Sequence, residues 1–306
     1  MSTSFLEVVE VAPRDGLQSV STLVPTQLKI DLIRNLHAAG LRRIEVTSFV
    51  SPAALPQLAD APEIVAAAKS LEGLDASVLV PTVRHAERAL AAGADHLVFV
   101  LSVSEAHNRS NVKRSPADSA AEYARVVALL PAGAKLRLNI ATAFDCPLTG
   151  RVSGAAVLAL LADLVPIAPW AEVGLCDTTG RASPAQVASL FTAVGHRFPT
   201  VARWAFHGHD TYGLGIANVL AAWQAGVRIV DASCAGLGGC PFAPGATGNV
   251  ATEDVVWTMH GMGIVTGVDL ERLCAVAQQY AALPGAQTGG RVRQALASAA
   301  RREGRI

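Results

Sequence analysis

Two histidines separated by one residue are the sharpest chemical signal in this sequence. His207 and His209 end a short apolar run of the kind that forms a buried β-strand. Side chains two positions apart on a strand face the same way, so both imidazoles can bind one metal ion. The alternative is a histidine pair whose hydrogen bonds serve only the core.

An acidic residue and an amide complete a candidate ligand set. Asp15 follows the first apolar run, and Asn139 and Asn249 are expected at the same end of the fold. Two imidazoles, one carboxylate and one amide oxygen suit Mg²⁺, Mn²⁺ or Zn²⁺ and leave positions free for substrate oxygens. Asp15 has a simpler alternative role, as a helix N-cap or as the ion-pair partner of Arg14.

Other charged residues near these ligands can serve a reaction or hold one another in place. Arg14 can bind an anionic oxygen, including that of a developing enolate. If Glu45 faces the same interior, it needs a partner, and Arg14 is the natural one. We expect Asp177 to orient Arg14 or a histidine from outside the ligand set. His107, on a neighbouring loop, is a weaker candidate.

A glycine-rich loop that contains Cys240 follows the last expected strand. It is a mobile lid, a backbone cradle for a phosphate or a plain surface loop. The cysteine argues against the plain loop, because an exposed thiol is reactive. The glycines are Gly236, Gly238, Gly239, Gly245 and Gly248. The other cysteines, Cys146, Cys176, Cys234 and Cys274, are expected mostly in the core, which fits a reducing cytoplasmic compartment.

Eight short runs rich in Val, Ile and Leu can supply the strands that position these residues. They are Glu7–Ala12, Arg43–Thr47, Ala76–Pro81, His96–Leu101, Leu136–Thr142, Glu172–Asp177, Arg203–His209 and Arg228–Ser233. Near-continuous apolar runs are typical of parallel strands buried on both faces. Helical patterns separate them, and Ser115-Pro116 and Ser183-Pro184 each supply an N-cap followed by proline.

Eight strand–helix units predict an α/β fold, a (β/α)₈ TIM barrel over about residues 5–265. Residues 266–306 are expected to add extra C-terminal helices to the same single catalytic domain, 1–306. An open doubly wound sheet is the alternative, and the absence of GxGxxG after the first strand weakens it. In a barrel the functional groups gather at the carboxyl ends of the strands, where all the candidates above lie.

Composition excludes several kinds of partner. The 25 basic and 25 acidic residues give zero net charge, which argues against a nucleic-acid partner but leaves room for a local cationic pocket. No apolar stretch is long enough to span a membrane. The first ten residues lack Lys and Arg, so neither a secretory nor a mitochondrial leader is expected, and we predict a cytoplasmic protein. We expect a homo-oligomer, either a dimer or a tetramer.

Four longer stretches around these residues resemble the hydroxymethylglutaryl-CoA lyase family over about residues 8–270. The stretches are 13–18 (PRDGLQ), 44–52 (IEVTSFVSP), 207–213 (HGHDTYG) and 235–241 (AGLGGCP), followed by 248–254 (GNVATED). The glycine-rich cysteine loop separates these lyases from the isopropylmalate and homocitrate synthases.

The resemblance implies a divalent-metal-dependent carbon–carbon lyase that cleaves 3-hydroxy-3-methylglutaryl-CoA to acetyl-CoA and acetoacetate. It also implies a place in leucine degradation and ketone-body formation. The implied metal ligands are Asp15, His207, His209 and Asn249. The implied catalytic residues are Cys240, Arg14, Asp15, His207 and Glu45. The implied substrate-binding residues are Arg14, Asn139, Asp177, Gly238 and Gly239.

Departures from the animal members of this family leave the exact acyl-CoA open. Those enzymes carry Tyr where this chain has Asn139, Cys where it has Gly208, and a Lys-bearing loop where it has 104–111. The same chemistry on a related 3-hydroxyacyl-CoA such as citramalyl-CoA is therefore the alternative. A metal-dependent hydrolase is less favoured, because its His-x-His normally follows the first strand. A non-catalytic barrel is the third possibility.

Overall fold

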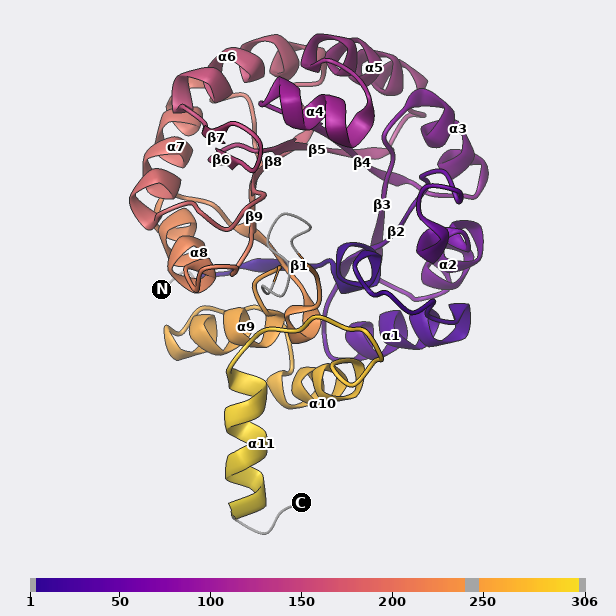
Figure 1. The fold of residues 1–306 in the computed structure, drawn as a ribbon, viewed down its shortest axis with the longest axis vertical. Helices are drawn as coiled ribbons and strands as arrows, with labels where there is room; N and C mark the ends of the chain where they lie inside the picture. The colour runs from indigo at the N-terminus through magenta and orange to yellow at the C-terminus, as the bar shows by residue number, and fades with distance from the viewer. Residues whose placement is uncertain (1–3, 240–247, 303–306) are drawn as a thin grey trace.

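The computed structural model describes residues 4–239 and 248–302, and they form a closed parallel barrel surrounded by helices (Figure 1). The strands follow one another around the barrel in the order β1, β2, β3, β4, β5, β8, β9, β10, with β10 beside β1. They are β1 (Glu7–Glu10), β2 (Arg43–Ser48), β3 (Asp75–Leu79), β4 (His96–Ser102), β5 (Lys135–Ala141), β8 (Glu172–Asp177), β9 (Trp204–Gly208) and β10 (Ile229–Ala232). The predicted TIM barrel is confirmed.

Helices cover the outside of the barrel, and two further helices follow it. The helices are α1 (Thr26–Ala38), α2 (Ala61–Lys69), α3 (Val83–Ala91), α4 (Glu105–Val112), α5 (Pro116–Leu129), α6 (Gly154–Leu164), α7 (Pro184–Arg197), α8 (Gly215–Gln224), α9 (Thr252–Gly261), α10 (Leu270–Tyr280) and α11 (Val292–Arg302). The last two are the predicted C-terminal helices, and α11 projects from the body (Figure 1). None of the described helices is long and apolar enough to cross a membrane.

Local sequence signals set several helix starts as expected. Ser115 and Ser183 each form a capping box, with Asp118 and Gln186 as the reciprocal partners, and a proline follows each serine. The first of two differences from the predicted barrel is an additional short hairpin. It consists of β6 (Asp145–Cys146) and β7 (Gly150–Arg151) and lies between β5 and α6.

The second difference is at the first strand, which ends at Glu10 rather than Ala12. A π-helical turn, Ala12–Gly16, follows and carries Arg14 and Asp15. The amides of Arg14, Asp15 and Gly16 all donate to the carbonyl of Val11, at 3.2, 2.8 and 3.2 Å. This compact turn places both charged residues directly after the carboxyl end of β1, at the barrel mouth.

The apolar core lies mainly between the barrel and its helices, and the barrel interior is largely polar. Val9, Val11, Ala205 and Ile229 form a small separate apolar cluster inside. Around it, Arg43, Arg137, Glu172 and Asp231 are all buried, as are the two histidines of β9 and its extension. TIM barrels usually fill their interior with branched apolar residues, so this charged interior requires every charge to be paired.

Candidate metal centre

Three of the predicted ligands converge at the carboxyl end of the barrel. Asp15, His207 and His209 offer ligand atoms that all lie within 4.8 Å of one another. The two imidazole rings are 5.2 Å apart, centroid to centroid, and are inclined by 58°. β1 pairs with β10 and β10 with β9, which brings the turn carrying Asp15 next to the histidines, as the closed barrel required.

A glycine separates the two histidines because a neighbouring ring occupies the space. A Cβ at Gly208 would lie 2.7 Å from the Phe206 ring. That ring is fixed by edge-on contacts with Phe144 and Phe191. In this chain, therefore, the packing of Phe206 accounts for Gly208, one of the departures from the animal enzymes.

An unpredicted carboxylate orients His207. Asp231 on β10 lies with its Oδ2 3.1 Å from His207 Nδ1, and it receives two hydrogen bonds from Arg137 on β5, at 2.7 and 2.8 Å. With Nδ1 engaged by Asp231, Nε2 is the nitrogen left to face a ligand. The sequence held a signal for this pair, because a charged residue inside an apolar strand must face a polar partner.

Arg137 also explains where Asn139 lies. Its Nε donates to Asn139 Oδ1 at 2.7 Å, and both side chains lie beside Gly174. A Cβ at Gly174 would be 2.8 Å from Arg137 Nη2, so glycine at that position makes room for the guanidinium. Asn139 thus lies inside the barrel, and its carbonyl oxygen is engaged by Arg137.

Arg14 links the ligand set to Glu45. It forms ion pairs with both Asp15 and Glu45. The predicted Arg14–Glu45 pair is therefore present. The simpler role considered for Asp15, an ion pair with Arg14, is also present and coexists with its place beside the histidines.

Asp15 and His209 have the ionisation states that a cation needs, an anionic carboxylate and a neutral imidazole. Burial alone would raise the pKa of Asp15, but the charges of Arg14 and the two histidines hold it well below its usual range. Burial, with the neighbouring charge of His207, lowers the pKa of His209 to about 4, so this imidazole is neutral at pH 7. Burial opposes protonation of His207 too, yet the hydrogen bond to Asp231 raises its pKa.

Asn249 is held beside Asp15 by its own amide group. Its Nδ2 donates to Asp15 Oδ2 at 2.8 Å and to the carbonyl of Leu237 at 3.2 Å. The backbone of Asn249 also pairs with that of His209. Since both amide hydrogens have acceptors, the carbonyl oxygen is the atom of this side chain suited to a cation.

The residues present fit a divalent cation. The donor set combines a carboxylate, imidazoles and an amide oxygen. His209 Nδ1 is buried and has no hydrogen-bond partner within residues 4–239 and 248–302. A buried nitrogen without a partner costs stability unless something binds it or faces it. A cation bound to this imidazole would offset that cost.

Three other predicted site residues, Asp177, His107 and Cys240, are not part of this cluster in the described residues. The Asp177 carboxylate accepts a hydrogen bond from the Ala182 amide at 3.2 Å, within the loop before α7, whereas the partners of Arg14 are Asp15 and Glu45. Nevertheless, burial raises the pKa of Asp177 to about 6. His107 is buried, with its Nδ1 2.7 Å from Ser102 Oγ. Cys240 lies outside the described residues.

Gly238 and Gly239 are required by close approaches that sequence reasoning missed. A Cβ at Gly238, whose φ is +143°, would lie 2.7 Å from Asn249 Nδ2. A Cβ at Gly239 would meet the side chain of Gln287 and, at 3.2 Å, that of Ser19. These contacts give both glycines a structural reason that is separate from binding a phosphate.

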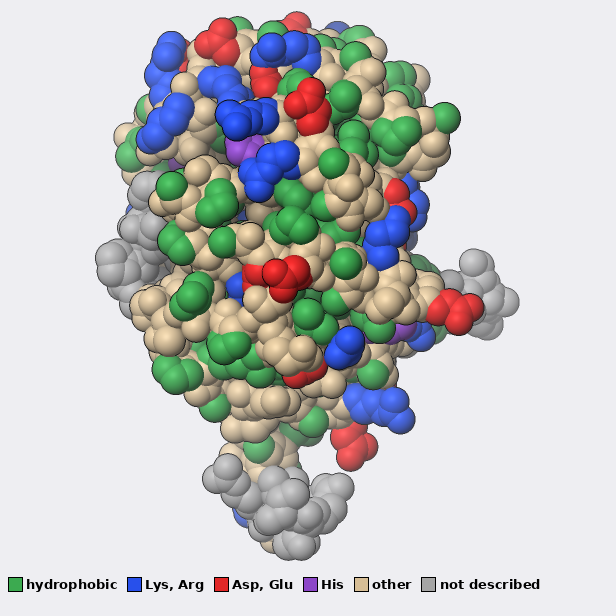
Figure 2. All heavy atoms as spheres, turned by 90° about the vertical axis from the view of Figure 1, so that its right-hand side faces the viewer, with side chains coloured by type: hydrophobic (Ala, Val, Ile, Leu, Met, Phe, Trp, Pro, Cys, Tyr) green, Lys and Arg blue, Asp and Glu red, His purple; other side chains and the backbone are tan. Residues whose placement is uncertain are grey.

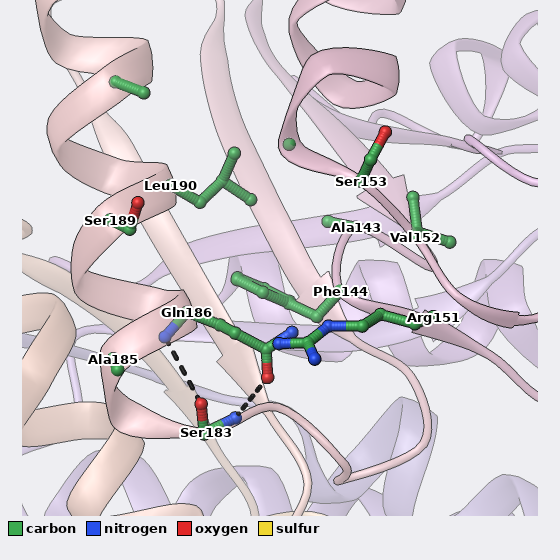
Figure 3. Close-up of a pocket in the computed structure, with 12 residues that line it drawn as sticks. Ala143, Phe144, Arg151, Val152, Ser153, Ser183, Ala185, Gln186, Ser189 and Leu190 are labelled. Atoms are coloured by element: carbon green, nitrogen blue, oxygen red, sulfur yellow. Dashed lines mark hydrogen bonds between the residues drawn. The ribbon is translucent and has the colours of Figure 1, made fainter.

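A cavity of about 560 Å³ lies elsewhere, between the hairpin β6–β7 and the starts of α6 and α7 (Figure 3). Phe144, Leu190 and Val152 line it together with Arg151, and the capping box of Ser183 and Gln186 closes one side. None of the predicted site residues lines this cavity. The candidate metal centre is therefore defined by its converging ligands rather than by this cavity.

The structure is thus a (β/α)₈ barrel whose mouth carries one aspartate and two histidines that could hold a metal ion. Comparison with known sequences gives the family: a sequence model described as HMGL-like matches residues 6–279. The chain belongs to the HMGL-like family.

Its relatives include enzymes with two different names. The mitochondrial hydroxymethylglutaryl-CoA lyase of Mus musculus is 42% identical over 291 residues, covering 95% of this chain and 89% of the mouse protein. The (R)-citramalyl-CoA lyase of Chloroflexus aurantiacus is 40% identical over 289 residues, covering 91% and 90%. A solved HMG-CoA lyase from Acinetobacter baumannii, in complex with coenzyme A and 3-methylmalate, is 40% identical, with a TM-score of 0.89 and 95% of each chain covered.

Proposed function

We propose that this protein cleaves 3-hydroxy-3-methylglutaryl-CoA to acetyl-CoA and acetoacetate with the help of a bound divalent cation, Mg²⁺ or Mn²⁺, with Zn²⁺ as an alternative. The observation that carries the proposal is the convergence of Asp15, His207 and His209, whose ligand atoms lie within 4.8 Å of one another. Family membership and identities near 40% to hydroxymethylglutaryl-CoA lyases support the same reaction.

The cation would be held by Asp15, His207, His209 and Asn249. It would supply Lewis-acid chemistry by lowering the pKa of a coordinated hydroxyl. Asp231 fixes the ring of His207, and Leu237 and Asp15 fix the amide of Asn249, so the ligands are held in place before a cation arrives.

Arg14 has the position and charge to stabilise the leaving enolate. Breaking the carbon–carbon bond removes the hydroxyl proton and leaves the electron pair on the thioester fragment. A fixed guanidinium lowers the energy of that developing charge more than mobile water does. Asp15 and Glu45 hold Arg14 on two sides, which limits its reorganisation during the reaction.

The enolate must finally take a proton to become acetyl-CoA. The family resemblance assigns this transfer to Cys240, directly or through water. The same resemblance gives Asn139, Asp177, Gly238 and Gly239 contacts with the substrate. Of these, Asp177 has a pKa that burial raises to about 6, and its charge interacts with that of His207. Such a carboxyl group can take up or release a proton near neutral pH.

A cationic patch on the rim supports an acyl-CoA substrate, because coenzyme A carries several phosphate charges. Partial burial lowers the pKa of His85, and the positive charges of Arg88 and Arg84 on α3 and of Arg114 before α5 lower it further. Within the described part of the chain, none of the three arginines forms an ion pair with an acidic side chain. Figure 2, which faces the right-hand side of Figure 1, shows Lys and Arg side chains gathered at its upper left.

Citramalyl-CoA is the second candidate substrate, since a curated relative at 40% identity bears that name. The same bond cleavage would then release pyruvate instead of acetoacetate. Asn139, where the animal enzymes have tyrosine, is the residue that we expect to bear on this choice. Its hydrogen bond with Arg137 fixes the amide within the barrel.

We also propose a cytoplasmic homo-oligomer that acts in leucine degradation and ketone-body formation. Large apolar side chains are exposed near one end of α9, which is common at interfaces between subunits. They are Phe5, Trp257, Met262 and Val265, each more than two fifths exposed. Light scattering of the purified protein would give the oligomeric state.

Metal removal tests the proposed function. Protein treated with a chelator should lose acetyl-CoA formation, and Mg²⁺ or Mn²⁺ should restore it. His209→Ala should stay folded but bind Mn²⁺ weakly in calorimetry and turn over slowly. Full activity in the metal-free protein would contradict the proposal.

A further inference from the structure

The connection between α10 and α11 runs back to the barrel mouth and pairs with the turn that follows β10. We call residues 285–293 the strap and residues 234–239 the mouth turn. The Gly289 amide donates to the carbonyl of Ala235 at 2.9 Å, and the Gly238 amide donates to the carbonyl of Gln287 at 3.3 Å. In Figure 1 this yellow connection arches over α9 and α10. The C-terminal extension is thus bonded to the site's rim.

The strap and the mouth turn touch backbone to backbone. A Cβ at Gly236 would lie 2.8 Å from Gly289 Cα, and the φ of Gly236 is +58°. A Cβ at Gly290, whose φ is +81°, would lie 2.8 Å from Ala251 Cβ. Glycine is therefore required at Gly236 for the mouth turn to approach the strap, and at Gly290 for the strap to approach the residue that precedes α9.

The start of α9 anchors the far end of the strap. Asp254 accepts hydrogen bonds from the amides of Arg291 and Val292, at 3.0 and 2.9 Å. Arg293 lies with its Nε 3.5 Å from Glu253, and Glu253 Oε2 accepts the Ala235 amide at 3.0 Å. Glu253, Asp254 and Arg293 are all buried, as is Ala235. Two adjacent acidic residues of α9 therefore hold the strap and the mouth turn together.

The mouth turn, in turn, holds a proposed metal ligand. The carbonyl of Leu237 accepts Asn249 Nδ2 at 3.2 Å, and the same nitrogen donates to Asp15 Oδ2 at 2.8 Å. Gly238, the next residue, is bonded to the strap. A displacement of the strap would move the acceptor that fixes the Asn249 amide and, through it, Asp15.

We propose that the strap is a positioning element of the active site: it sets the orientation of Asn249 and Asp15 for the cation through the mouth turn. The inference rests on the metal centre of the proposed function. It assigns a catalytic purpose to a segment outside the barrel. The competing explanation is that the strap only attaches the last two helices to the body, in which case it stabilises the fold and leaves the cation site unchanged.

Gly290→Ala tests the strap against a matched control, Gly263→Ala. Both positions have a left-handed φ, +81° and +71°, so alanine strains the backbone similarly at each. A Cβ at Gly263 meets nothing within 4 Å, whereas at Gly290 it collides with Ala251. We expect Gly290→Ala to weaken Mn²⁺ binding about 10-fold by calorimetry and to lower kcat, as loss of groups that orient metal ligands does. Gly263→Ala should change neither by more than about twofold.

The outcomes separate the explanations. If both variants lower Tm alike and leave Mn²⁺ affinity at the wild-type value, the strap is only an attachment and the proposal is wrong. If Gly290→Ala does not fold, Asp254→Asn replaces it, since it keeps one acceptor oxygen and removes the charge. Wild-type Mn²⁺ affinity in a folded Asp254→Asn would also overturn the proposal. A wild-type protein that binds Mn²⁺ but does not cleave the carbon–carbon bond of 3-hydroxy-3-methylglutaryl-CoA would refute the proposed function and leave this comparison valid.

Discussion

Replacing Asp231 by Asn should weaken cation binding although every proposed metal ligand is left unchanged. In the wild type, Asp231 receives two hydrogen bonds from Arg137 and lies 3.1 Å from His207 Nδ1. Asp231 Oδ2 serves both Arg137 and His207, and Oδ1 accepts a further hydrogen bond from Arg137. Asn has one acceptor oxygen in place of two, so at least one of these three contacts is lost, and its amide carries no charge to hold the imidazole. Partners that orient metal-bound histidines are commonly worth 10- to 100-fold in affinity, or about 1.4–2.7 kcal/mol. We expect Asp231→Asn to fall in that range for Mn²⁺.

Glu172→Gln is the control for general damage to the charged interior. Glu172 accepts hydrogen bonds from Arg43 at 2.7 and 2.8 Å and lies 3.5 Å from Arg137, so it belongs to the same buried network without contacting His207. Each substitution disturbs a buried ion pair, whose complete loss typically costs about 3–5 kcal/mol of folding stability. Both should therefore lower the free energy of unfolding, measured with urea.

Calorimetric titration with Mn²⁺ separates the two effects. Asp231→Asn should lose affinity, and Glu172→Gln should stay within about threefold of the wild type. Equal losses in both variants would show that the network acts only through stability. Unchanged affinity in Asp231→Asn would refute the idea that Asp231 orients His207.

Three further predictions concern other parts of the molecule. Burial raises the pKa of Glu10 from 4.5 to about 7, so the folded protein holds a proton that the unfolded chain releases, and the free energy of unfolding should fall between pH 5 and 7 by up to about 3 kcal/mol. Denaturant titrations at several pH values should show this fall reduced by that amount in Glu10→Gln. Arg84→Ser combined with Arg88→Ser should raise KM for a coenzyme A thioester but not for the matching pantetheine thioester, and an equal rise for both would contradict a phosphate contact. Cys240→Ser should lower kcat by about 10²- to 10⁴-fold with little change in substrate binding, and wild-type turnover would assign the thiol no role.

The barrel could be predicted from sequence because its strands are short apolar runs separated by well-marked helices. The closed order of the strands then placed Asp15 beside His207 and His209, without any knowledge of side-chain contacts. The ion pair between Arg14 and Glu45 followed from the need to neutralise a buried carboxylate.

Contacts between distant segments could not be predicted in the same way. Asp231 and Arg137 are far apart in sequence, and only the barrel's register shows that they meet. Asp177 was expected to orient Arg14 or a histidine outside the ligand set, and that role stays a prediction. The contact that its carboxylate makes, with the Ala182 amide in the loop of its own strand–helix unit, could not be read from the sequence. The glycines of the mouth turn suggested a lid or a phosphate cradle, whereas Gly236 and Gly239 lie against the strap. Nothing in the local sequence indicates that approach.

Product analysis with the Mn²⁺-loaded protein tests the central claim most directly. The protein would be incubated separately with 3-hydroxy-3-methylglutaryl-CoA and citramalyl-CoA, and acetyl-CoA, acetoacetate and pyruvate would be quantified with and without a chelator. The account predicts metal-dependent release of equal amounts of acetyl-CoA and acetoacetate from the first substrate, with a higher kcat/KM than for the second. Cleavage that persists in the chelator, or acetyl-CoA and pyruvate formed from citramalyl-CoA alone, would contradict it.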